Sequence, residues 1–117
     1  MKRPETTIEV NRARAQKVQE YILRHYGQDL TLTVLAAQVN IVPTTLCHVF
    51  KEVTGQRVSE YIIQTRISQA ARLLLETDQE VQTIAYECGF STQTNFNRHF
   101  KHLMGCTPTD YRLKQRK

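Results

Sequence analysis

Apolar residues recur at α-helical spacing along most of this chain. Leu46, Val49, Phe50 and Val53 follow the i, i+3, i+4, i+7 spacing of a helix with one apolar face. Similar patterns occupy residues 10–26, 32–39, 59–77, 81–88 and 92–104, and a short last helix follows Pro108. We therefore predict an all-α fold of about seven helices.

The predicted helices have inward faces and recognisable end residues. Besides the four residues above, the expected inward side chains are Val18, Tyr21, Ile22, Tyr26, Leu32, Leu35, Ala36, Val39, Tyr61, Ile62, Ala70, Ala71, Leu74, Leu75, Val81, Ile84, Ala85, Cys88, Phe96, Phe100, Leu103 and Tyr111. Thr31 is the expected N-cap of the second helix, and Pro43 suits the first position of the third. Gly55 and Gly105 are expected to end their helices, because glycine readily adopts the left-handed C-cap conformation.

The second half of the chain repeats the first. At an offset of 49, Leu32, Leu35, Ala36, Val39 and Ile41 match Val81, Ile84, Ala85, Cys88 and Phe90. At an offset of 50, Leu46, Phe50, Lys51, Gly55, Ser59, Glu60 and Tyr61 match Phe96, Phe100, Lys101, Gly105, Thr109, Asp110 and Tyr111. One extra residue enters at 91–93. A repeat of this length indicates one supersecondary unit used twice.

Each copy has the pattern of a helix, a tight turn and a second helix. Gly89 tolerates the positive φ of a sharp turn, and Ser91 is the expected cap of the helix after it. Ala36 and Ala85 lie in the middle of each first helix. Their small side chains allow the second helix to cross closely, as a helix-turn-helix requires. The pattern predicts two helix-turn-helix subdomains joined by a long linker helix.

The expected organisation of the chain follows from this repeat. We predict a disordered N-terminus over 1–8, an N-terminal lobe over 9–56, a linker helix over 57–77, a C-terminal lobe over 78–113 and a basic tail over 114–117.

Composition narrows the function less than the repeat does. The chain has 16 basic and 11 acidic residues, for a net charge of +5, but four of the basic residues lie after Tyr111. The total charge is therefore only weak evidence for nucleic-acid binding, and the positions of the basic residues are more informative. No apolar run approaches the roughly 18 residues of a membrane span, and no signal peptide is apparent, so we expect a cytoplasmic protein.

The sequence offers little for catalysis or for a bound cofactor. Cys47, Cys88 and Cys106 lack paired metal-ligand spacing, and an odd number of cysteines does not suit a disulfide framework. We expect Cys88 in the core, a half-buried structural role for His99, and no role for Cys106. No nucleophile–base pair, phosphate-binding glycine loop or zinc motif is present. We therefore expect no enzyme activity, cofactor, metal or small-molecule site.

The chain resembles the AraC/XylS family of transcription regulators over roughly residues 13–113. The motifs that carry the resemblance are Ile84-Ala85-Tyr86-Glu87-Cys88-Gly89-Phe90-Ser91, Phe96-Asn97-Arg98-His99-Phe100-Lys101 and Gly105-Cys106-Thr107-Pro108-Thr109-Asp110-Tyr111-Arg112. Leu35-Ala36-Ala37, Leu46, Phe50-Lys51 and Thr54-Gly55 add to it in the first lobe. The resemblance implies bacterial promoters as targets, recognition helices in successive major grooves, and activation through RNA polymerase. One departure is Val42, which stands where a small hydroxyl cap is usual.

The outward faces of the two second helices are the expected DNA-reading surfaces. In the second lobe, arginine suits guanine, and glutamine and asparagine suit adenine. We assign base reading there to Gln93, Thr94, Asn97 and Arg98. In the first lobe the matching set is Thr44, Cys47 and His48, which offers mainly small contacts, so weaker binding is expected there. Expected phosphate contacts are Lys51, Lys101, Arg57 and Arg112.

Two further geometric and functional expectations complete the prediction. A linker helix of this length spans roughly 25–28 Å at 1.5 Å per residue. That length suits recognition helices about 34 Å apart, which is one turn of B-DNA. The alternative function is a protein-interaction module that keeps the fold and binds little DNA.

Overall fold

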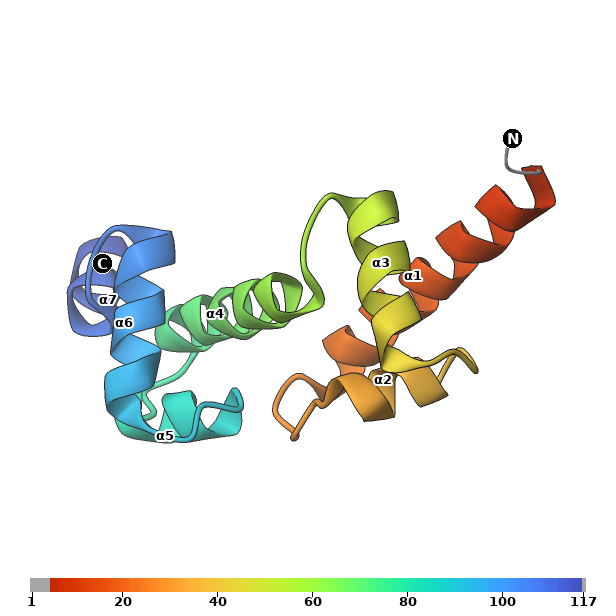
Figure 1. Cartoon of the computed structure of the whole chain (residues 1–117). Helices are drawn as coiled ribbons and strands as arrows, with labels where there is room; N and C mark the ends of the chain where they lie inside the picture. Colours follow the sequence, from red (N-terminus) through yellow and green to blue (C-terminus); the bar gives the residue numbers. More distant parts are fainter. Residues whose placement is uncertain (1–4, 117) are drawn as a thin grey trace. The chain divides into compact units, whose positions relative to one another are not determined.

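The computed structural model describes residues 5–116, with side chains from residue 7 onward, and shows seven helices in that range (Figure 1). They are α1 (Glu5–His25), α2 (Leu32–Ala37), α3 (Pro43–Thr54), α4 (Val58–Glu76), α5 (Val81–Glu87), α6 (Gln93–Met104) and α7 (Pro108–Gln115). The predicted all-α class is confirmed. Residues 5–8, expected to be disordered, form the start of α1, and residues 1–4 of that prediction lie outside the described residues.

The chain forms two compact units whose segments alternate along the sequence. The first unit contains α1 to α3 and the start of α4, through Ile62. The second contains the short segment 26–29 and everything described from Ile63 onward. Helix α4 is therefore more than a connecting rod, because it supplies Val58 and Ile62 to one core and Ile67 and Leu74 to the other.

The core of the first unit forms where α3 packs against both α1 and α2. Phe50 is fully buried among these helices, together with Ile22 and Leu35. The Phe50 ring meets the Tyr61 ring edge-on, with centroids 5.7 Å apart. Aromatic pairs favour this arrangement because the positive ring edge meets the negative ring face.

The second unit repeats this packing with its own residues. Phe96 and Phe100 are fully buried between α5, α7 and the later part of α4. The rings of Phe100 and Tyr111 meet edge-on with centroids 5.5 Å apart, and this pair lies 50 positions after the Phe50–Tyr61 pair. The duplication predicted from sequence is thus confirmed down to the ring geometry. The start of α4 closes the first unit in the same way that α7 closes the second.

Both helix-turn-helix turns use the same backbone hydrogen bond. The Ile41 N–H donates to the Ala36 carbonyl at 3.2 Å, and the Phe90 N–H donates to the Ala85 carbonyl at 3.0 Å. The residue that turns the chain has positive φ in both copies, 56° at Asn40 and 100° at Gly89. Asparagine and glycine are the residues that tolerate this conformation best.

Most of the expected helix ends are confirmed. Thr31 caps α2 by accepting from the Val34 N–H, and Pro43 occupies the first turn of α3. Gly55 and Gly105 end α3 and α6 in the left-handed conformation. Val42 precedes α3 without a side-chain cap, as its apolar side chain dictates.

The predicted cap of α6 is wrong by one residue. The cap is Thr92, whose hydroxyl accepts from the Asn95 N–H at 3.1 Å, and Ser91 lies in the turn. The reason is the extra residue of the second copy, which lengthens the turn before α6. Thr92 therefore corresponds to Val42 in the first copy.

Three positions predicted to face inward are exposed instead. Leu32, Val53 and Leu103 are 40%, 37% and 45% exposed. Each lies in the first or last turn of its helix. Tyr26, expected in the first helix, lies just after α1 and packs against the second core.

The two titratable groups predicted to be structural are buried as expected. Cys88 is fully buried, and burial raises the pKa of its thiol to about 11, with a further contribution from Glu87. His99 is half-buried near the Phe90 ring. Burial lowers the pKa of His99, and the neighbouring Arg98 and His102 act in the same direction. Between residues 5 and 116, no helix is long and apolar enough to cross a membrane.

Candidate nucleic-acid interface

Helix α6 divides into a buried aromatic side and an exposed polar side. Phe96 and Phe100 are fully buried, whereas Thr94, Asn97 and Arg98 are exposed. Gln93, in the first turn of α6, is half-buried. The polar side therefore presents amide, hydroxyl and guanidinium groups on a helix held in place by its opposite face.

A neighbouring side chain orients Arg98. One guanidinium nitrogen of Arg98 donates to Oδ1 of Asn95 at 2.7 Å. Long side chains in a helix lean toward its N-terminus, so this bond places the guanidinium over the first turns of α6, near Thr94. Sequence reasoning missed Asn95 as part of the site. Its i, i+3 spacing from Arg98 is the signal that indicates such a pair.

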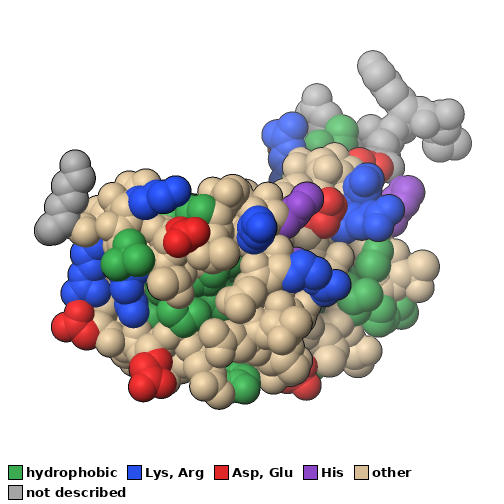
Figure 2. Space-filling view, turned by 90° about the vertical axis from the view of Figure 1, so that its left-hand side faces the viewer, with side chains coloured by type: hydrophobic (Ala, Val, Ile, Leu, Met, Phe, Trp, Pro, Cys, Tyr) green, Lys and Arg blue, Asp and Glu red, His purple; other side chains and the backbone are tan. Residues whose placement is uncertain are grey.

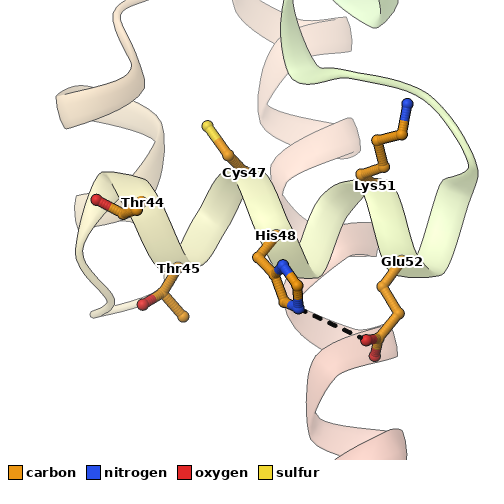
Figure 3. A pocket seen from close by; sticks show the side chains of 6 residues that line it. All are labelled: Thr44, Thr45, Cys47, His48, Lys51 and Glu52. Atoms are coloured by element: carbon orange, nitrogen blue, oxygen red, sulfur yellow. Dashed lines mark ion pairs between the residues drawn. The ribbon is translucent and has the colours of Figure 1, made fainter.

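The outward side of α3 is less charged and less able to make paired hydrogen bonds. Thr44, Thr45, Cys47, His48, Lys51 and Glu52 line a shallow pocket along it (Figure 3). Cys47 and Lys51 point to one side of the helix, and His48 and Glu52 point to the other. The three predicted base readers of this helix, Thr44, Cys47 and His48, are all exposed. They offer a methyl group, a thiol and an imidazole.

An acidic neighbour modifies the surface of α3. His48 Nε2 lies 4.0 Å from a carboxylate oxygen of Glu52, one helical turn later. The His48 side chain is 80% exposed, so solvent weakens this pair strongly. The matching pair in α6 is Arg98 and His102, where no carboxylate opposes the arginine. The outward side of α3 is consequently the less basic of the two.

Three of the four predicted phosphate contacts are exposed basic side chains. Lys51 and Lys101 stand at matched positions near the ends of α3 and α6, and Arg57 precedes α4. On the face drawn in Figure 2, lysine and arginine side chains are spread among uncharged ones, with a few acidic groups. The positions of individual basic side chains near α3 and α6 are therefore a better guide to phosphate contacts than the total charge of the chain.

The fourth predicted phosphate contact, Arg112, has partners within the protein. Its guanidinium donates to the Leu74 carbonyl at 2.9 Å and to the Thr77 carbonyl at 3.2 Å. Arg116 donates to the same Thr77 carbonyl and pairs with Asp78. These bonds satisfy carbonyl groups at the C-terminal end of α4, which lack partners within the helix. Sequence spacing gave no sign of this role.

Comparison with known proteins decides the family. A family model described as a helix-turn-helix domain matches residues 35–114, which is more than half of the chain and includes both turns. The chain belongs to the AraC-type helix-turn-helix family. This confirms the resemblance found in the sequence, and it makes the chain a DNA-binding domain of the kind found in transcription regulators, not an enzyme.

Relatives of known structure share the AraC-type fold over most of their length. The C-terminal domain of AraT, a response regulator from Geobacillus stearothermophilus, is 32% identical with a TM-score of 0.85, covering 89% of this chain and 87% of that one. The DNA-binding domain of AdpA, a global transcriptional factor solved with a target DNA, is 29% identical with a TM-score of 0.81. That match covers 85% of this chain and 89% of the other.

Curated relatives of the AraC-type chain are considerably longer. The uncharacterised regulator YtdP of Bacillus subtilis (strain 168) is 36% identical over 97 residues, covering 82% of this chain and 13% of the relative. The transcriptional activator RhaR of Mannheimia succiniciproducens is 32% identical over 88 residues, covering 75% and 32%. The matched part of the chain thus spans less than a third of the length of each relative.

Proposed function

We propose that this chain binds double-stranded DNA sequence-specifically and regulates transcription at bacterial promoters, with α6 and α3 as recognition helices in successive major grooves. The observation that carries the proposal is the polar side of α6. Asn97 and Arg98 are exposed there, outside the buried side formed by Phe96 and Phe100. A major groove admits one α-helix, and its base edges bind amide and guanidinium groups in pairs of hydrogen bonds.

The two helices have different chemistry, and we propose that they read DNA differently. Helix α6 supplies Arg98 for guanine, and Gln93 and Asn97 for adenine, with Thr94 against a thymine methyl. Helix α3 supplies Thr44, Cys47 and His48, and reads fewer bases. Lys51, Lys101, Arg57 and the partly engaged Arg112 are the proposed phosphate contacts, which set position without reading sequence.

We also propose that the chain activates transcription through contact with RNA polymerase and that it acts in the cytoplasm. One relative is named a transcriptional activator, and one structural relative was solved with its target DNA. Both names support promoter DNA as the partner of this domain. A comparison of transcription from a selected site, with and without the purified chain and RNA polymerase, distinguishes activation from repression.

The experiment that tests the proposal is selection of bound sequences from a random duplex pool. We expect enrichment of an asymmetric site with two half-sites about 10 base pairs apart, the stronger one facing α6. Binding to the selected duplex is expected to fall steeply between roughly 50 and 200 mM salt, because phosphate contacts release counterions. An interaction module with an AraC-type fold would enrich nothing and would bind duplex weakly at every salt concentration.

Replacing Lys101 by alanine is expected to weaken binding to the selected duplex and to a random duplex equally. The slope of log affinity against log salt is expected to become shallower by about 1, because one phosphate contact is lost. Lys17→Ala is the matched control, since Lys17 is an exposed lysine on α1, outside both recognition helices. A loss confined to the selected duplex would contradict the phosphate role of Lys101.

Removing thymine methyl groups from the α3 half-site is expected to lower affinity. The Thr44 side chain can contact a thymine methyl through its own methyl group, and deoxyuridine lacks that thymine methyl. A buried methyl contributes about 0.8 kcal/mol, roughly fourfold in affinity. Thr44→Ser, which removes the methyl from the protein side, is expected to abolish the sensitivity at one position. Unchanged affinity for deoxyuridine throughout this half-site would show that α3 does not read methyl groups.

A further inference from the structure

One arginine of α4 binds a chain segment from the opposite half of the sequence. Arg66 Nε donates to the Tyr26 carbonyl and a terminal nitrogen donates to the Gln28 carbonyl, both at 2.8 Å. The planar guanidinium, with its donors in a fixed fork, is suited to two acceptors held side by side. Segment 26–29 belongs to the second unit together with α5 and α6, so all of these contacts lie within that unit.

The same segment packs against the turn that precedes α6. A Cβ added to Gly89 would lie 2.6 Å from the Tyr26 carbonyl oxygen and 2.7 Å from Arg66 Nε. A Cβ added to Gly27 would lie 2.4 Å from the Glu87 carbonyl oxygen. All three distances are far below van der Waals contact. Glycine is therefore required at position 89 for two reasons. Its φ is 100°, and the Tyr26 carbonyl and Arg66 leave no room for a side chain.

The corresponding turn of the first unit has no such packing. Asn40 occupies the place of Gly89 with a φ of 56°, and its side chain is exposed. Lys17 corresponds to Arg66, since it precedes buried Val18 as Arg66 precedes buried Ile67, and Lys17 is also exposed. The two turns share the backbone hydrogen bond and the residue of positive φ, so the arrangement at Arg66 is an addition specific to the second unit.

We propose that Arg66 is a positioning residue for α6. By binding the Tyr26 and Gln28 carbonyls, it holds the Tyr26 carbonyl against Gly89. It thereby fixes the turn from which α6 departs, and so fixes the direction of Asn97 and Arg98. This inference rests on the proposed function, because it concerns how precisely α6 meets base edges. Binding sites lose specificity when the surrounding structure leaves the contact groups loosely held.

The test compares Arg66→Met and Arg66→Lys with wild type in the full chain. Methionine keeps much of the apolar stem and removes the donors, whereas lysine keeps the charge without the fork. We expect both variants to remain folded, with faster amide hydrogen exchange at residues 89–93, because local opening becomes easier. Discrimination against mutations in the α6 half-site of the pool-selected duplex is expected to fall about tenfold, the effect of one mismatched base pair. Discrimination at the α3 half-site stays at the wild-type value.

A glycine pair supplies a second test that does not depend on removing the arginine. Gly89 and Gly105 have similar positive φ, but nothing lies within 4 Å of a Cβ added to Gly105. Gly105→Ala therefore measures backbone strain alone, and Gly89→Ala measures strain plus the clash with Tyr26 and Arg66. We expect Gly89→Ala to lower Tm more than Gly105→Ala does. Loss of discrimination at the α6 half-site is expected for Gly89→Ala and not for Gly105→Ala.

The outcomes separate this inference from the proposed function. Wild-type exchange and discrimination in both Arg66 variants would overturn the positioning role, as would equal loss at the two half-sites, which indicates general unfolding. If the wild-type chain enriches no duplex at all, the proposed function fails. Even then, amide exchange tests the inference separately. Unchanged exchange at residues 89–93 in Arg66→Met would show that Arg66 does not fix the turn.

Discussion

Replacing Phe100 by alanine is expected to lower the free energy of unfolding by about 3–5 kcal/mol. Phe100 is fully buried, its ring centroid lies 5.6 Å from that of Phe96 and 5.5 Å from that of Tyr111, and alanine leaves a cavity that both rings border. A chain of this size is typically stable by about 6–18 kcal/mol, so the loss is a large share of the total. Thermal and denaturant unfolding measure it directly.

Leu103 provides the matched control for Phe100 on the same helix. It is 45% exposed, so Leu103→Ala is expected to change stability by less than about 0.5 kcal/mol, as surface substitutions usually do. Comparable losses for the two variants would mean that the last turn of α6 is packed, contrary to the structure. The Phe100→Leu variant is expected to fall between the two, because leucine refills part of the cavity.

Replacing Arg98 by alanine is expected to weaken binding to the selected duplex by about 1–3 kcal/mol and to relax base preference at one position. The planar guanidinium of Arg98 can pair with both acceptors of guanine, O6 and N7. Its bond to Asn95 holds it over the first turns of the helix, so little orientation is lost on binding. Titration of the selected duplex and of its single-base variants measures both effects.

Arg98→Lys separates charge from geometry at this position. Lysine keeps the positive charge, so the salt dependence of binding is expected to match wild type. Base preference is expected to weaken, because lysine lacks the planar fork. If Arg98→Ala bound selected and random duplexes as wild type does, the assignment of Arg98 as a base reader would be abandoned. Equal weakening toward both duplexes would instead assign it to phosphate.

The fold was predictable because the apolar spacing that defines each helix is a local pattern and occurs in two copies. The pattern around Leu46 and Phe50 defines one helix face, and the copy around Phe96 and Phe100 shows which features belong to the unit. Removing that inward face leaves the outward one, which is how Asn97 and Arg98 were identified. The structure shows both side chains exposed, and their contact with DNA stays a prediction.

The errors arise where helix ends meet their surroundings. Spacing alone extends the apolar stripe to Leu103, but the helix crossing that buries Phe96 and Phe100 does not reach it. The extra residue of the second copy moves the cap from Ser91 to Thr92, and sequence comparison cannot place such an insertion to a single position. Both errors concern less than one helical turn.

Long-range polar contacts were out of reach for a different reason. Arg66 meets the Tyr26 carbonyl 40 positions earlier, and Arg112 meets the Leu74 carbonyl 38 positions earlier. Their acceptors are backbone carbonyl groups, which every residue carries, so no side-chain pattern marks them. An arginine that binds carbonyl groups therefore looks the same in the sequence as one that binds phosphate.

The alternation of segments between the two units restricts how this chain can be divided. A fragment beginning at Ile63 retains α5, α6 and α7 but lacks residues 26–29, and with them both carbonyl acceptors of Arg66. A fragment ending before Val58 lacks Tyr61, whose ring packs edge-on against Phe50. Neither half of the sequence alone therefore reproduces its lobe, and a binding study of one recognition helix requires a chain that includes both halves.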